Sequence, residues 1–78
     1  MKKIRLYLNK VEDVKRFVQL TRSVSGDINA AHNHYTVDAK SLLGVMSLNL
    51  SEPIDVTIIS DEDEECDKLI MNCKQWIV

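Results

Sequence analysis

The chain has 78 residues, of which 45% are hydrophobic and 28% are charged, and its formal net charge is −2. This length allows one domain (residues 1–78) around a single small core, and it excludes an enzyme that must enclose a large pocket. The apolar fraction excludes intrinsic disorder, the near-neutral charge gives no electrostatic footprint for nucleic acid, and no apolar run approaches the ~20 residues that cross a bilayer. We therefore expect a soluble cytoplasmic protein without a cofactor.

The N-terminal part of the chain predicts a strand followed by a helix. Lys3–Leu8 alternates charged or amphipathic with aliphatic side chains, as a half-buried strand does. Apolar positions with a 3.6-residue period then predict a helix over about residues 10–24. Asn9 is placed to cap that helix, and Glu12 three residues later completes a capping box.

The middle of the chain predicts a hairpin, a short helix and a further strand. Asp27–Ala39 alternates again and carries Asn33 near its centre, which favours a β-hairpin. Ser41–Leu50 is typical of a short apolar helix, which Pro53 prevents from continuing. Ile54–Ile58 alternates with polar residues and predicts a fourth strand.

The C-terminal part predicts an amphipathic helix that begins with Ser60 as its cap. The acids Asp61–Glu65 suit the first turn, where the helix dipole is positive. The apolar positions follow the spacing i, i+3, i+4, i+7 and i+11: Cys66, Leu69, Ile70, Cys73 and Ile77. Trp76 is expected at the C-terminal edge. The two cysteines would lie about 10.5 Å apart on one helix face, too far for a disulfide, so we expect reduced buried thiols.

The order β-α-β-β-α-β-α predicts an α+β fold with two layers, an open-faced sandwich of one antiparallel sheet and three helices on a single face. The other sheet face would be left to solvent, where polar residues are expected: Arg5, Asn29, Thr36, Asp38, Asp55 and Thr57.

Patterns typical of catalysis or metal binding are mostly absent. The only glycines, Gly26 and Gly44, are isolated and form no phosphate-binding loop. His32 and His34 flank the hairpin turn and are expected on the same sheet face, but no third ligand is evident, so we predict no metal site. Ser41 is expected to cap its helix, a position that also stabilises an added phosphate.

The segment VDAKSLLGVMSL, residues 37–48, resembles the second-helix motif of HPr, the histidine-containing phosphocarrier family of the bacterial sugar phosphotransferase system. The resemblance implies a four-stranded antiparallel sheet in the order 1-4-2-3. It places Ser41 at the serine that a regulatory kinase phosphorylates in many Gram-positive members. It also places Leu42, Leu43 and Met46 in the apolar patch by which the family docks its partners, although such residues can equally belong to the core.

The chain departs from the family at the phosphorylation site. An ungapped match puts Lys10 at the phosphorylated histidine, Glu12 at the phosphate-binding arginine and Asp13 at the proline. A lysine ammonium is a poor phosphoryl acceptor at neutral pH. The two acids would repel a phosphate, and both histidines of the chain lie in the hairpin.

We therefore expect an HPr-like domain that has lost phosphocarrier chemistry and acts as a non-catalytic regulatory or protein-binding module. Its protein partner is not identified by the sequence, and neither nucleic acid nor a membrane is expected to bind. Two alternatives stay open: a phosphocarrier that uses an atypical residue, and a small-molecule or metal-binding α+β domain that uses the solvent-facing sheet surface or the His32/His34 pair.

Overall fold

The computed structural model describes residues 1–78, and its elements follow the predicted order. They are β1 (Lys2–Leu6), α1 (Val11–Thr21), β2 (Asp27–His32), β3 (Tyr35–Asp38), α2 (Leu42–Met46), β4 (Ile54–Ile59), α3 (Asp63–Asn72) and the 3₁₀ helix Lys74–Trp76. None of the helices combines the length and the apolar character that crossing a membrane requires.

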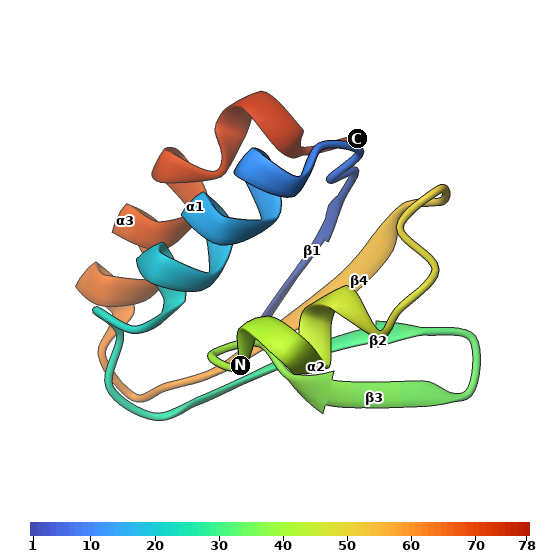
Figure 1. Cartoon of the computed structure of the whole chain (residues 1–78). Helices are drawn as coiled ribbons and strands as arrows, with labels where there is room; N and C mark the ends of the chain where they lie inside the picture. The colour runs from blue at the N-terminus through green and yellow to red at the C-terminus, as the bar shows by residue number, and fades with distance from the viewer.

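The four strands form one antiparallel sheet in the order β1-β4-β2-β3, as the resemblance implied. Figure 1 shows α1 and α3 side by side, with α2 nearer to β3. Alternate residues of the central strand β4 are fully buried beneath the helices: Ile54, Val56 and Ile58. The predicted α+β sandwich with its helices on one face is confirmed.

A cluster of 18 buried residues fills the space between the sheet and the helices. Phe17 of α1 is fully buried, and its ring makes a T-shaped contact with that of Trp76, at a centroid distance of 6.5 Å and an angle of 89° between the ring planes. The opposite sheet face is polar, as predicted, and carries an ion pair between Arg5 Nε and Asp55 Oδ1 at 3.1 Å. Buried apolar area on one face therefore holds the two layers together.

The predicted caps of α1 and α3 are wrong. Lys10, not Asn9, is the N-cap of α1, and no side chain caps this helix. Glu62 is the N-cap of α3, and Ser60 instead accepts a hydrogen bond on Oγ from Glu62 N at 3.1 Å. The side chain of a polar residue near a helix start can accept a hydrogen bond from a backbone N–H of a turn instead of one from the helix, because both bonds join residues two or three apart.

The prediction that Ile77 continues the last helix is also wrong. The helix ends at Asn72, and Ile77 pairs with Leu6 in an isolated antiparallel bridge. Tyr7 N donates to Trp76 O at 2.9 Å, and Val78 N donates to Arg5 O at 3.1 Å. Figure 1 shows the C-terminus beside the end of β1. The last residues thus cover part of the outer edge of the sheet.

Gly26 links α1 to β2 in a backbone conformation that other residues rarely adopt. Its φ is +88°, and a Cβ built there would lie 2.5 Å from the carbonyl oxygen of Ile59. Only glycine fits this close approach of the loop to β4.

The substitution Gly26→Ala is therefore expected to lower the free energy of unfolding by about 1–3 kcal/mol, the cost of a strained non-glycine backbone. Urea denaturation monitored by circular dichroism measures the change. Gly44→Ala is the control, because the nearest contact of its Cβ is 3.3 Å from Ser41 Oγ and no positive φ is involved. Equal losses in the two variants would contradict the role of Gly26.

Candidate functional site

The start of α1 carries the three residues that the sequence match placed at the family's phosphorylation site. Lys10 and Glu12 are exposed, and Asp13 is half-buried in the first turn. The only backbone bond at the cap runs from Val14 N to Lys10 O at 3.1 Å. Lys10 forms no ion pair, so its ammonium is free at the surface.

The chemistry of these three side chains differs from that of a phosphorylated histidine with an arginine beside it. An ammonium group has three N–H donors and no lone pair with which to attack phosphorus. Glu12 and Asp13 place two carboxylates on the first turn of α1, where a phosphate would otherwise meet free backbone N–H groups. The two carboxylates and a phosphate carry charges of the same sign and repel each other, so the start of α1 favours cations over phosphate.

The start of α2 has the geometry that the sequence predicted. Ser41 is its N-cap, with φ −101° and ψ 116°, and Ser41 Oγ accepts a hydrogen bond from Gly44 N at 3.1 Å. Lys40 just before it is anchored to the loop after α1, because its Nζ donates to Val24 O at 2.6 Å and to Gly26 O at 2.8 Å. Ser41 is therefore held in place from both sides.

The three apolar residues predicted to form a patch on α2 are not equally exposed. Leu43 is 84% exposed and Met46 is 42% exposed. Leu42 is half-buried and packs against the core, while Val45 is fully buried and anchors the helix. Leu43 and Met46 are thus exposed at the surface, while Leu42 is partly exposed and also contributes to the core.

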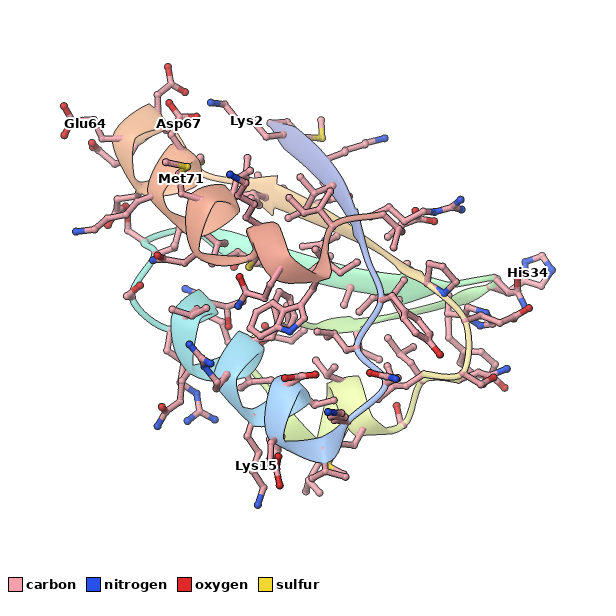
Figure 2. All side chains as sticks on the ribbon, turned by 90° about the horizontal axis from the view of Figure 1, so that it is seen from above. Lys2, Lys15, His34, Glu64, Asp67 and Met71 are labelled. Atoms are coloured by element: carbon pink, nitrogen blue, oxygen red, sulfur yellow. The ribbon has the colours of Figure 1, made fainter.

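The prediction that His32 and His34 share one sheet face is wrong. His32 pairs with Tyr35, so His34 belongs to the two-residue turn together with Asn33, whose φ is +55°. Figure 2 shows His34 at the tip of the hairpin. His32 Nε2 instead contacts Glu52 Oε1 at 2.7 Å, and no group of three or more metal-binding side chains is present.

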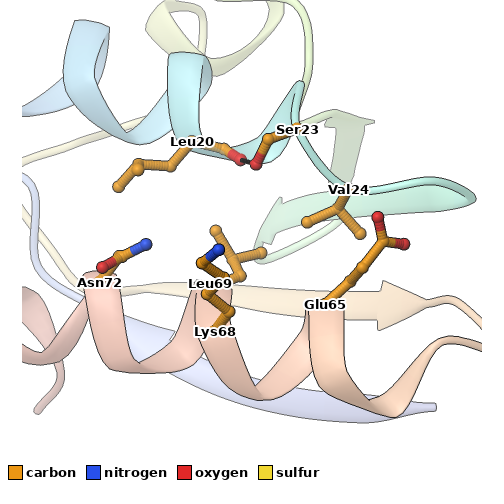
Figure 3. Close-up of a pocket in the computed structure, with 7 residues that line it drawn as sticks. All are labelled: Leu20, Ser23, Val24, Glu65, Lys68, Leu69 and Asn72. Carbon is orange, nitrogen blue, oxygen red and sulfur yellow. Dashed lines mark hydrogen bonds between the residues drawn. The ribbon is translucent and has the colours of Figure 1, made fainter.

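A hollow between α1 and α3, drawn in Figure 3, contains Glu65, an acid of α3 that Ser25 anchors by two hydrogen bonds. Ser25 donates to Glu65 Oε1 from its backbone N at 3.1 Å and from its Oγ at 2.5 Å. These two bonds lower the pKa of Glu65 below its usual 4.5, since they favour the carboxylate. The hollow measures about 170 Å³, less than ligand pockets usually do, so this acid has a structural role.

The two cysteines are free and buried, as predicted. Burial raises the pKa of the Cys73 thiol to about 11, because the charged thiolate loses its hydration. A thiol with such a pKa is a weak nucleophile at neutral pH. Cys73 is therefore a core residue rather than a reactive one.

Comparison with known proteins identifies relatives for most of the chain. Residues 13–71 match the family model described as PTS HPr component phosphorylation site. The chain is also similar to a protein solved as the crystal structure of HPr-C-His from Thermoanaerobacter tengcongensis, with 26% sequence identity and a TM-score of 0.77. That similarity covers 96% of this chain and 93% of the other. The family match begins at Asp13, just after Lys10 and Glu12.

The bonds from Ser25 make a pH-dependent contribution to stability that can be measured. Because the pKa of Glu65 is lowered in the folded state, this contribution is present above the unfolded pKa and is lost as the pH falls through the folded pKa. Ser25→Ala should raise the pKa of Glu65 toward 4.5, as followed by its side-chain NMR signals between pH 2 and 7. Ser23→Ala is the control, since Ser23 Oγ donates to Leu20 O; a pKa that is the same in wild type and Ser25→Ala would contradict the assignment.

Proposed function

This chain is a member of the PTS HPr family, and on that premise we propose that it is a regulatory, protein-binding domain that has lost the phosphocarrier histidine. Proteins of this family are phosphocarriers that interact with other proteins of the phosphotransferase system. The observation that carries the proposal is a contrast between two helix starts. Lys10 and two acids stand at the start of α1, whereas Ser41 caps α2 beside an exposed apolar surface.

The position of the histidines supports the loss of phosphocarrier chemistry. A carrier needs an imidazole nitrogen with a free lone pair at the start of α1. The chain has two histidines, and both belong to the β2–β3 hairpin. His32 Nε2 is in contact with Glu52 Oε1, and His34 lies at the exposed tip of the hairpin. Neither is placed to take over the role of the residue at position 10.

The geometry of α2 supports a role in binding and regulation. On this proposal a serine kinase transfers the terminal phosphoryl group of a nucleoside triphosphate to Ser41. The bond from Ser41 Oγ to phosphorus forms as the bond from phosphorus to the diphosphate oxygen breaks, and the hydroxyl proton passes to a base of the kinase. Leu42, Leu43 and Met46 provide the docking surface. All 78 residues act as a single HPr-like domain, which we place in the cytoplasm with the nucleotide donor.

A transfer assay tests the loss of carrier chemistry. When the chain is incubated with the ³²P-phosphorylated general enzyme of the phosphotransferase system, we expect no acid-labile label. The double substitution Lys10→His with Glu12→Arg should introduce labelling, because it restores the acceptor and removes one repelling charge. His32→Ala is the control for the hairpin. Acid-labile label on the unsubstituted chain would overturn the proposal and favour a carrier that uses an atypical residue.

A kinase assay tests the docking surface. Leu43→Asp is expected to slow phosphorylation of Ser41 by the serine kinase of this system at least tenfold, because a charge replaces an exposed apolar contact. Met71→Asp is the matched control, since Met71 is 71% exposed on α3 and outside the proposed surface. Ser41→Ala should abolish the mass increase. An unmodified wild-type chain, or equal slowing in both Asp variants, would contradict this role.

A further inference from the structure

Arg22, the C-cap residue of α1, is held beside Ser41 by one of its five N–H groups. Arg22 Nε donates to Lys40 O at 3.1 Å. That carbonyl belongs to the peptide bond that joins Lys40 to Ser41, so standard geometry places Nε within about 6 Å of the Ser41 Cα. Arg22 forms no ion pair, and its two terminal nitrogens donate to no protein group.

Lys40 is the cation next to Ser41 in sequence, but two of the three N–H groups of its ammonium already have partners. Lys40 Nζ donates to two backbone carbonyls, Val24 O and Gly26 O, at 2.6 and 2.8 Å. Moving it toward Ser41 would leave both carbonyls without this partner. Lys40 therefore keeps a single free N–H, whereas both terminal nitrogens of Arg22 keep theirs.

The surroundings of Arg22 favour a negatively charged group. A hollow of about 380 Å³ lies between α1 and α2, and Lys15, Arg16 and Arg22 line it together with Leu42. No acid is among its lining residues. The carboxylate nearest to Ser41 in sequence is that of Asp38, which accepts a hydrogen bond on Oδ1 from Lys40 N at 2.9 Å. Figure 2 shows Lys15 pointing from α1 to the outside of the molecule.

We propose that Arg22 is the internal receptor for a phosphate on Ser41. This inference rests on the proposed function in that it takes Ser41 as the modified residue. The planar guanidinium, oriented by Nε, would offer its two terminal nitrogens to two phosphate oxygens. Phosphorylation would then tie α1 to the start of α2 and neutralise one cation of the hollow. The phosphate would then change the charge beside the docking surface through a contact within the molecule.

The test is independent of any kinase when phosphoserine is incorporated at position 41 during synthesis. The ³¹P signal of the phosphorylated chain is followed between pH 4 and 9 to give the second pKa of the phosphate, which is about 6 for an isolated group. Arg22→Gln should raise that pKa by about 0.2–0.7 unit, the range for a partly exposed ion pair. Arg16→Gln, another arginine of the same hollow, should raise it by less than half as much.

A second measurement uses the unsubstituted chain, so it does not depend on whether Arg22→Gln keeps its structure. In the unsubstituted chain, phosphorylation should slow the exchange of the Arg22 terminal N–H protons with water and leave those of Arg16 unchanged. Equal phosphate pKa values in wild type and Arg22→Gln, or equal shifts in the Arg16 and Arg22 variants, would overturn the inference. If the kinase leaves Ser41 unmodified but the ³¹P shift is found, the proposed function fails while the receptor role of Arg22 stands.

Discussion

The insertion of β4 between β1 and β2 is the constraint on which the rest of the structure depends. Among the strands, β1 pairs only with β4, and β2 also pairs with β4. Residues 54–59 therefore join β1 to the rest of the sheet. The three fully buried residues of β4 belong to the apolar sheet face that the helices cover: Ile54, Val56 and Ile58. Gly26 allows the loop after α1 to approach the end of the same strand. The positions of the helix starts, and of the groups on them, follow from this central strand.

Most of this architecture could be predicted from periodicity, because one-sided burial leaves a clear pattern in strands and helices. The alternation in Ile54–Ile58 and the spacing of Cys66, Leu69 and Cys73 both correspond to buried faces. What could not be predicted is where local hydrogen bonds end an element. Ser60 serves a turn instead of the helix, and Ile77 leaves the helical pattern to pair with Leu6. These outcomes depend on partners that are distant in sequence or on competition between equally short bonds.

The candidate site was predictable to a similar degree. Ser41 caps α2 as its sequence context indicated, since that bond is local. The unequal exposure of Leu42 and Leu43 could not be derived from five helical residues, because it depends on how α2 lies against α1 and β3. The histidine pair failed as a prediction because a two-residue turn removed His34 from the strand. The role of Lys40, which bonds to carbonyls 14 and 16 residues away, had no sequence signal at all.

The net charge of −2 conceals a separation of charge that bears on phosphate chemistry. Six of the twelve acids lie in the stretch Asp61–Asp67, which has no basic residue, so the other 71 residues carry ten basic groups against six acids, a net charge of +4. Figure 2 places Glu64 and Lys15 on opposite sides of the molecule. Exposed charges are screened beyond about 10 Å at 0.1 M salt, so the acids of α3 do not cancel the positive hollow beside Ser41.

The two ends of α1 therefore differ in how they meet a phosphate. Glu12 and Asp13 at its start oppose the group that a carrier would have to hold, whereas Arg22 at its end keeps free donors next to Ser41. On the proposed function, phosphate recognition in this chain depends on the C-terminal end of α1 rather than on its start. The fold supplies the geometry for such recognition, because it brings Arg22 of α1 and Leu42 of α2 to the same hollow.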